Sequence, residues 1–197
     1  LWMRLVLHEL HAARKTLQAN KLRPAFKMLS RVARIFEQLN NAWDVLRTMT
    51  PSEYTSFRAS LGQSSGFQSF QYRQSEFLLG NRTPAMWMPH AHRSADHAVL
   101  SQELTQPSLY DVALQQLAGS LPLPDHVLAR DLGGPYTADD AVTAAWNKVY
   151  QSPDQYWELY ELAEKLVDCE DYFRRWRFNH VTTVERVIGF KRGTGGT

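Results

Sequence analysis

The sequence predicts an all-α protein that forms one helical bundle over residues 1–197. Apolar residues recur at intervals of three and four, most clearly between Pro24 and Thr48. Residue patterns typical of helix starts precede several of these stretches. We find no alternation of period two, no βαβ order and no internal repeat. With 197 residues and 44% hydrophobic residues, the chain is large enough for a single domain with its own core.

The first helix is predicted over residues 1–19, with Leu10 and Leu17 among its apolar positions and Arg14 on its outer face. His8 and His11 in this helix are three positions apart. The zinc-protease motif needs two histidines four positions apart with a glutamate between them. We therefore interpret both as surface or interface histidines.

The second helix is predicted from Pro24 to about Thr48, with proline in its first turn. Its apolar stripe comprises Met28, Leu29, Val32, Phe36, Leu39, Trp43 and Leu46. Trp43 most simply packs in the core at the end of this stripe.

A short third helix is predicted to start at Thr50 as N-cap, with Glu53 closing a capping box, and to end near Gly62. Tyr54 and Arg58 lie four residues apart and share a face of this helix. They would suit a carboxylate ligand, since arginine binds carboxylates bidentately and tyrosine adds a donor. A cation–π pair at the surface is the alternative. The small residues that follow Gly62 either let a planar group approach the backbone or form an ordinary turn.

Further helices are predicted over residues 67–79, from Pro107 to about Leu117, and from a cap at 137–140 to about Tyr150. Residues from about 82 to 97 are predicted as a loop, in which His90 and His92 are solvated. The last helix is predicted from 152–154 to about Phe190, a length of about 55 Å. Such a helix usually serves as the spine of a bundle.

His180 lies on this last helix, with Trp176, Val184 and Val187 at near-helical spacing. Such a histidine is either buried and hydrogen-bonded or a metal ligand, and one imidazole is enough to hold a haem iron from one side. The glycine-rich run at 193–196 follows a helix rather than a strand, so we do not interpret it as a phosphate loop. It is either a mobile tail or a segment that closes over a ligand.

The composition narrows the class of protein further. A net charge of +2 does not favour binding to nucleic acid or to an anionic membrane. The single Cys169 excludes an intramolecular disulfide and favours a reducing compartment. No apolar run is long enough for a bilayer and no signal peptide is visible, so we expect a cytoplasmic protein. The first residues enter an amphipathic pattern without a cap, and we expect both native termini to extend beyond this chain.

Four segments of the chain resemble the bacterial tryptophan 2,3-dioxygenases: residues 51–54, 61–69, 76–81 and 176–197. They occur in the order that this family shows. The resemblance implies an all-helical, homotetrameric, cytoplasmic enzyme with haem b. Such an enzyme inserts both atoms of O2 across the indole 2,3 bond of L-tryptophan and yields N-formyl-L-kynurenine, the first step of tryptophan breakdown.

The resemblance also implies roles for individual residues. It implies His180 as the proximal haem ligand, Tyr54 and Arg58 at the substrate carboxylate, Thr194 at the amino acid end of the substrate, and Trp43 and Ser65 near the haem. The family's distal histidine precedes the segment corresponding to this chain, so we expect no catalytic acid or base within it. Two alternatives remain: a haem-binding or haem-sensing protein without turnover, and an interaction module built on the basic helix from Arg174 to Arg192.

Overall fold

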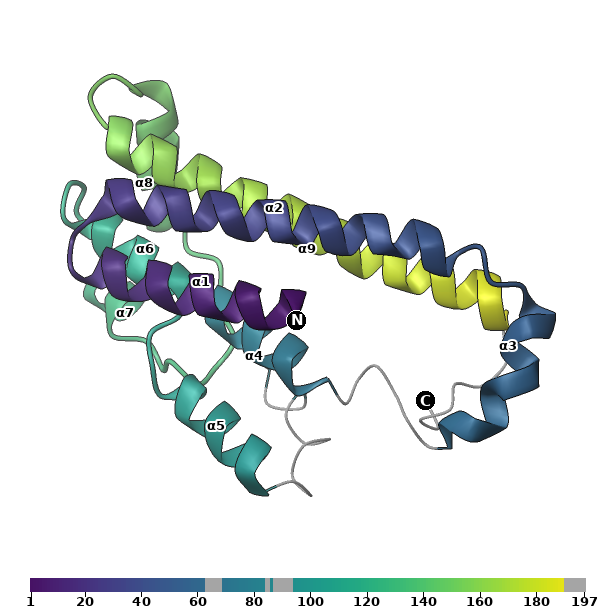
Figure 1. The fold of residues 1–197 in the computed structure, drawn as a ribbon. Helices are drawn as coiled ribbons and strands as arrows, with labels where there is room; N and C mark the ends of the chain where they lie inside the picture. The colour runs from purple at the N-terminus through teal and green to yellow at the C-terminus, as the bar shows by residue number, and fades with distance from the viewer. Residues whose placement is uncertain (63–68, 84–85, 87–93, 190–197) are drawn as a thin grey trace.

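The computed structural model describes residues 1–62, 69–83, 86 and 94–189, and these residues form an all-α bundle without a β-strand (Figure 1). The predicted fold class is therefore confirmed. The helices are α1 (Trp2–Gln18), α2 (Leu22–Leu46), α3 (Pro51–Arg58), α4 (Phe70–Leu79), α5 (Ser94–Leu104), α6 (Leu109–Ala118), α7 (Asp125–Leu128), α8 (Asp140–Gln151) and α9 (Trp157–Ile188), and a short 3-10 helix, η1 (Ala59–Leu61), follows α3.

The spine of the bundle is the pair α2 and α9, which lie side by side and run in the same direction (Figure 1). Arg23 near the start of α2 pairs with Glu158 near the start of α9, and Arg47 after the end of α2 contacts Thr183. α9 has 32 residues and is therefore about 48 Å long. α1 packs antiparallel to α2, and Arg31 binds the Glu9 carboxylate with two hydrogen bonds of 2.8 Å.

Two apolar clusters hold these helices together. The larger cluster lies between α1, α2, α4, α6 and α9, and the second joins α6, α7 and α8 to the first turn of α9. Cys169 belongs to the larger cluster, where its thiol donates to the carbonyl oxygen of Leu29. Burial raises the pKa of this thiol to about 12. The α2–α9 contact is thus apolar along much of its length.

The predicted start of α3 is confirmed as a capping box. The Thr50 hydroxyl accepts a hydrogen bond from the Glu53 amide at 3.3 Å, and the Glu53 carboxylate accepts from the Thr50 amide at 2.7 Å. Both interactions satisfy amide groups that the first turn of a helix leaves without partners. They fix where α3 begins, and therefore which residues of α3 share a face.

We expect Thr50→Ala to loosen the first turn of α3, because loss of an N-cap hydroxyl costs about 1 kcal/mol. Amide hydrogen exchange of Glu53 and Tyr54 should accelerate roughly fivefold, the factor equivalent to this energy. Thr50→Ser keeps the hydroxyl and is the matched control.

The hydrogen bonds from Thr50 hold the pKa of Glu53 below its ordinary value of 4.5. The stabilisation by its carboxylate is thus complete above pH 4.5 and is lost as the pH falls through that lowered pKa.

Several arginines lie inside the bundle rather than on its surface. Arg82 is 1% exposed and donates to the carbonyl oxygens of Phe77, Leu104, Leu132 and Glu103. It thereby joins the ends of α4 and α5 to the segment after α7. The prediction that Arg14 lies on the outer face of α1 was wrong: its side chain is 12% exposed and pairs with the buried carboxylate of Glu103. A charged partner on a distant helix outweighed the preference of arginine for solvent.

Several helix boundaries differ from the predictions, and α2, predicted from Pro24, begins at Leu22. The loop predicted to reach residue 97 ends earlier, since α5 begins at Ser94. α6 begins after Ser108, whose hydroxyl forms a capping box with Asp111, and not at Pro107. α9 begins at Trp157, because residues 152–156 form turns before it. His90 and His92 lie outside the described residues.

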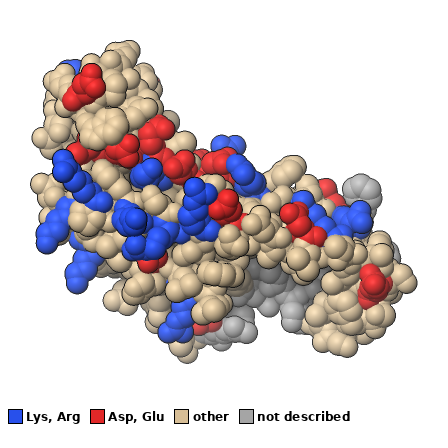
Figure 2. Space-filling view, turned by 45° about the horizontal axis from the view of Figure 1, so that its top comes forward, with Lys and Arg blue, Asp and Glu red and all other residues tan. Residues whose placement is uncertain are grey.

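Charged side chains are mixed on the face of the molecule that Figure 2 shows, where Asp and Glu lie among Lys and Arg. On the basic stretch of α9, Arg174 and Arg175 pair with Glu170 and Asp171 of the same helix, which lowers the net positive charge that this stretch presents. In the parts of the chain that the structure describes, no helix is long and apolar enough to cross a bilayer.

Candidate haem site

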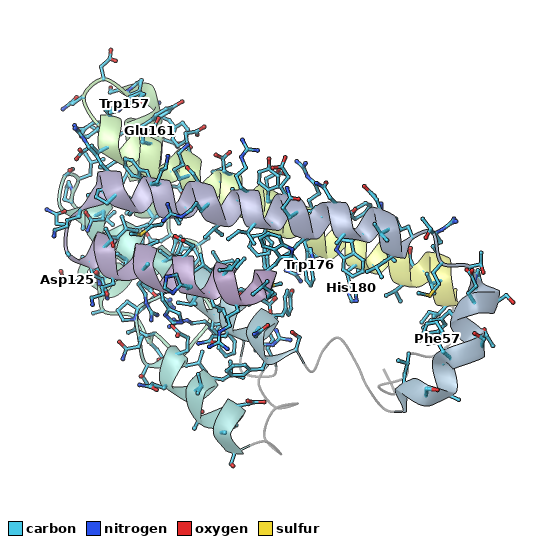
Figure 3. All side chains as sticks on the ribbon, in the orientation of Figure 1. Phe57, Asp125, Trp157, Glu161, Trp176 and His180 are labelled. Carbon is cyan, nitrogen blue, oxygen red and sulfur yellow. The ribbon has the colours of Figure 1, made fainter. Side chains whose placement is uncertain are left out.

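His180 projects from α9 to the side of the α2–α9 pair on which α3 and α4 lie (Figure 3). Its imidazole is half-buried and packs against two indole rings, which also contact each other at a centroid distance of 5.7 Å. The ring centroid of Trp43 on α2 lies 5.3 Å away, and that of Trp176, one helical turn earlier on α9, lies 6.1 Å away. Trp176 and His180 are nearly parallel, with 10° between their planes. Each helix of the spine thus contributes one indole to an aromatic cluster that packs against the imidazole.

The environment of His180 favours the form that binds metals. Burial lowers the pKa of the imidazole below its ordinary value, because desolvation penalises the charged ring. Neutral imidazole is the form that donates a lone pair to a metal. Among the described residues, none hydrogen-bonds to this ring. The described residues therefore do not support the interpretation of His180 as a buried histidine with a hydrogen-bond partner in the chain.

A second aromatic layer lies behind Trp176. The ring of Tyr72 on α4 packs between Trp176 and Phe173, at centroid distances of 5.2 and 5.7 Å. Its hydroxyl donates to Glu76 at 2.9 Å, and Glu76, only 1% exposed, also pairs with Arg73. Burial, reinforced by the Glu76 charge, raises the pKa of Tyr72, so its hydroxyl remains a donor. The sequence patterns did not indicate this layer, because its polar residues lie on the buried side of α4.

Tyr54 and Arg58 are in contact on α3, as their spacing predicted. The guanidinium carbon of Arg58 lies 6.0 Å from the centroid of the Tyr54 ring, and both residues are half-buried. This is the cation–π contact that the sequence left open, and it keeps the two polar groups together for a ligand as well. The other two predicted site residues, Ser65 and Thr194, lie outside the described residues.

The two histidines of α1 are placed differently. His8 is exposed, whereas His11 contacts Arg14 and Gln74 at 3.2 and 3.4 Å. Within the described ranges, no three metal-ligating side chains of His, Cys, Asp or Glu gather at one point. A single imidazole is sufficient only where a prosthetic group supplies the remaining ligands, as a porphyrin does.

Comparison with known proteins decides the family. A family model described as tryptophan 2,3-dioxygenase matches residues 1–149 and 143–197. The chain belongs to the tryptophan 2,3-dioxygenase family. The tryptophan 2,3-dioxygenase of Ruegeria pomeroyi is 67% identical over 198 residues, covering 100% of this chain and 71% of the relative. The proteins of that name from Bradyrhizobium diazoefficiens and Pseudomonas aeruginosa are 63% and 59% identical over the whole chain, which covers 71% and 69% of them.

For a member of the tryptophan 2,3-dioxygenase family, the groups around His180 fit a haem. The indole N–H of Trp43 is buried, yet it has no hydrogen-bond partner among the described residues. Leaving such a donor unpaired costs about 1–3 kcal/mol. A porphyrin beside His180 would bring carboxylate side chains that can accept from a donor of this kind. Trp43 therefore does more than extend the core stripe of α2: its ring contacts His180, and the described residues leave its buried N–H unpaired.

Proposed function

We propose that residues 1–197 act as one helical domain that binds haem b and the substrate of a tryptophan 2,3-dioxygenase. The reaction inserts both atoms of O2 across the indole 2,3 bond of L-tryptophan and gives N-formyl-L-kynurenine, the first step of the kynurenine pathway. The observation that carries this proposal is His180 in a member of this family: a half-buried imidazole that packs against two indoles and has no hydrogen-bond partner in the described chain.

In this proposal His180 holds the haem iron from one side, and Trp43 and Ser65 lie near the porphyrin. The bound haem supplies the binding and activation of O2, which protein side chains alone do not provide. Trp43 and Trp176 contact each other and the imidazole, and they form an apolar surface beside it. We assign no acid or base catalyst to this chain.

Tyr54, Arg58 and Thr194 are proposed to bind the amino acid end of L-tryptophan. A planar guanidinium can bind a carboxylate with two parallel hydrogen bonds, and a phenol adds a third donor. The contact between Tyr54 and Arg58 holds these donors together before the ligand arrives. Binding of the amino acid end of L-tryptophan then fixes the orientation of its indole. Part of the binding energy is thus used to align the indole for reaction.

We further propose that the enzyme is a homotetramer of the cytoplasm. Large apolar side chains are exposed on both spine helices, with Phe178 67% exposed and Val45 71% exposed. Val181, Leu46 and, on α1, Trp2 add to this exposed apolar surface. Surfaces of this kind mark sites of association between subunits. One cysteine, itself buried, suits a reducing compartment.

The proposed function is tested by spectroscopy and turnover on the haem-loaded protein. We expect the ferrous CO complex to show the spectrum of a histidine-ligated haem that shifts when L-tryptophan is added. We also expect uptake of O2 that depends on L-tryptophan, with formation of N-formyl-L-kynurenine. A shifted spectrum without product would favour the haem-sensing alternative. No haem binding by the folded protein would contradict both.

A further inference from the structure

We propose that Asn40 and Arg47 of the α2 segment are positioning residues that set the orientation of His180 through contacts with its neighbours on α9. This inference rests on the proposed function, in which His180 binds the haem iron. Neither residue contacts the imidazole. Both instead hold the turn of α9 that carries it.

The contact between α2 and α9 changes character just before His180. Up to Phe36 and Phe173, whose ring centroids are 5.3 Å apart, it is apolar. Beyond them the facing residues of α2 are Asn40, Trp43 and Arg47, at spacings of three and four. These spacings place all three on one face of the helix. Trp43 lies against the imidazole, and a polar residue flanks it on either side.

Asn40 holds α9 from within the helix interface. Its side chain is 8% exposed and donates to the carbonyl oxygens of Phe36 at 2.9 Å and Tyr172 at 3.1 Å. Its own amide oxygen accepts from the side chain of Asn179 at 3.0 Å. Asn179 directly precedes His180. Because Asn40 is buried, removing one of its partners would leave a buried polar group without a hydrogen bond.

Arg47 contacts the same turn of α9 and also the residues that follow His180. Its guanidinium donates to the Asn179 side-chain oxygen at 2.7 Å and to the hydroxyls of Thr182 at 2.8 Å and Thr183 at 3.0 Å. Its backbone oxygen accepts from Arg186 at 2.7 Å. One arginine thus contacts residues on both sides of His180 in the sequence. Because the guanidinium is planar and its N–H groups point in fixed directions, these hydrogen bonds permit only one orientation of α9 relative to Arg47.

The arrangement matters because the imidazole has no hydrogen-bond partner among the described residues to orient it. Successive residues of a helix point about 100° apart, so a rotation of α9 turns His180 together with Asn179. Two flat indole contacts permit such a rotation more readily than directed hydrogen bonds do. Asn40, Arg47 and Asn179 therefore fix the direction from which the imidazole reaches the iron. Residues that orient a metal ligand in this way influence the strength of its bond to the metal and the redox potential of the metal.

The test is resonance Raman spectroscopy of the ferrous holoenzyme, in which the iron–histidine stretching band reports the orientation and strength of that bond. We expect Arg47→Met and Asn179→Leu to retain haem but to give a broader band at lower frequency, with a shifted midpoint potential of the iron. Arg47→Lys, which keeps the charge but has one donor nitrogen in place of three, should recover part of the change. Asp44→Asn is the matched control: it removes the exposed partner of Arg47 at 3.6 Å and leaves every contact with α9 intact.

An unchanged band and potential in folded Arg47→Met and Asn179→Leu would overturn the proposal, even if their melting temperatures fell. If either variant failed to fold, the comparison of Arg47→Lys with Asp44→Asn would decide in the same way. Failure of the proposed function is a separate result. The wild-type holoenzyme would then show no iron–histidine band, or would keep its band after His180→Ala.

Discussion

Replacing His180 by alanine is expected to abolish stable haem binding. Among the described residues, this site offers the iron one imidazole, and the rings beside it are indoles without metal-binding atoms. Loss of a residue that hydrogen-bonds to a metal ligand typically lowers the affinity for the metal about 10- to 100-fold. Loss of the ligand itself should therefore lower haem affinity by at least about 100-fold. Titration of the purified apoprotein with haemin, followed by its visible absorption, measures this directly.

Two controls separate ligation from folding. His8→Ala removes an exposed histidine of α1 and should leave haem affinity unchanged. His180→Gly should recover a histidine-like spectrum when free imidazole is added, because the small molecule can occupy the space of the missing ring. Circular dichroism must show that α9 remains helical in both His180 variants. An unchanged haem spectrum in His180→Ala would contradict the assignment.

Replacing Arg58 by alanine is expected to weaken the binding of L-tryptophan far more than that of haem. Charge-assisted hydrogen bonds contribute about 1.5–3 kcal/mol, which corresponds to a rise in KM of roughly 10- to 100-fold. Because the guanidinium is proposed to meet the carboxylate and not the iron, the haem spectrum without substrate should be unchanged. Steady-state kinetics of product formation, together with haem titration, give both quantities.

The substrate itself provides the control for Arg58. Tryptamine has the indole of tryptophan but lacks the carboxylate, so Arg58→Ala should remove most of the preference for tryptophan over tryptamine. Arg58→Lys keeps the charge but loses the second donor, and it should recover the preference only in part. Equal losses of haem and tryptophan binding would instead show that Arg58 acts through its contact with Tyr54, as a structural residue of α3.

The parts of the fold that follow local rules could be predicted from the sequence. The capping box at Thr50 and Glu53 depends on residues three positions apart, and α3 begins where it indicates. The apolar stripe of α2 located the core-facing side, with Leu29, Val32 and Phe36 buried. Leu46, at the end of that stripe, is 46% exposed, because the apolar contact with α9 ends earlier.

The parts that depend on distant partners could not be predicted. α5 buries only Leu100 and Glu103 among its described residues, so it shows little apolar periodicity. The burial of Glu103 makes sense only with Arg14, which lies 89 positions away. In the same way, Asn40 and Asn179 are ordinary polar residues in the sequence, and only the packing of α2 on α9 joins them. The family resemblance indicated a role for His180 but none for the residues that contact its helix.

The buried thiol of Cys169 has a consequence for how the enzyme is handled in air. Thiolates, rather than thiols, react with oxidants and alkylating reagents, and a pKa of about 12 leaves almost no thiolate at neutral pH. Residues 1–197 contain no other cysteine, so this folded part of the protein offers these reagents no readily ionised thiol. Modification of Cys169 would require α2 and α9 to separate. The thiol is thus an intrinsic reporter of how often the spine of the bundle opens.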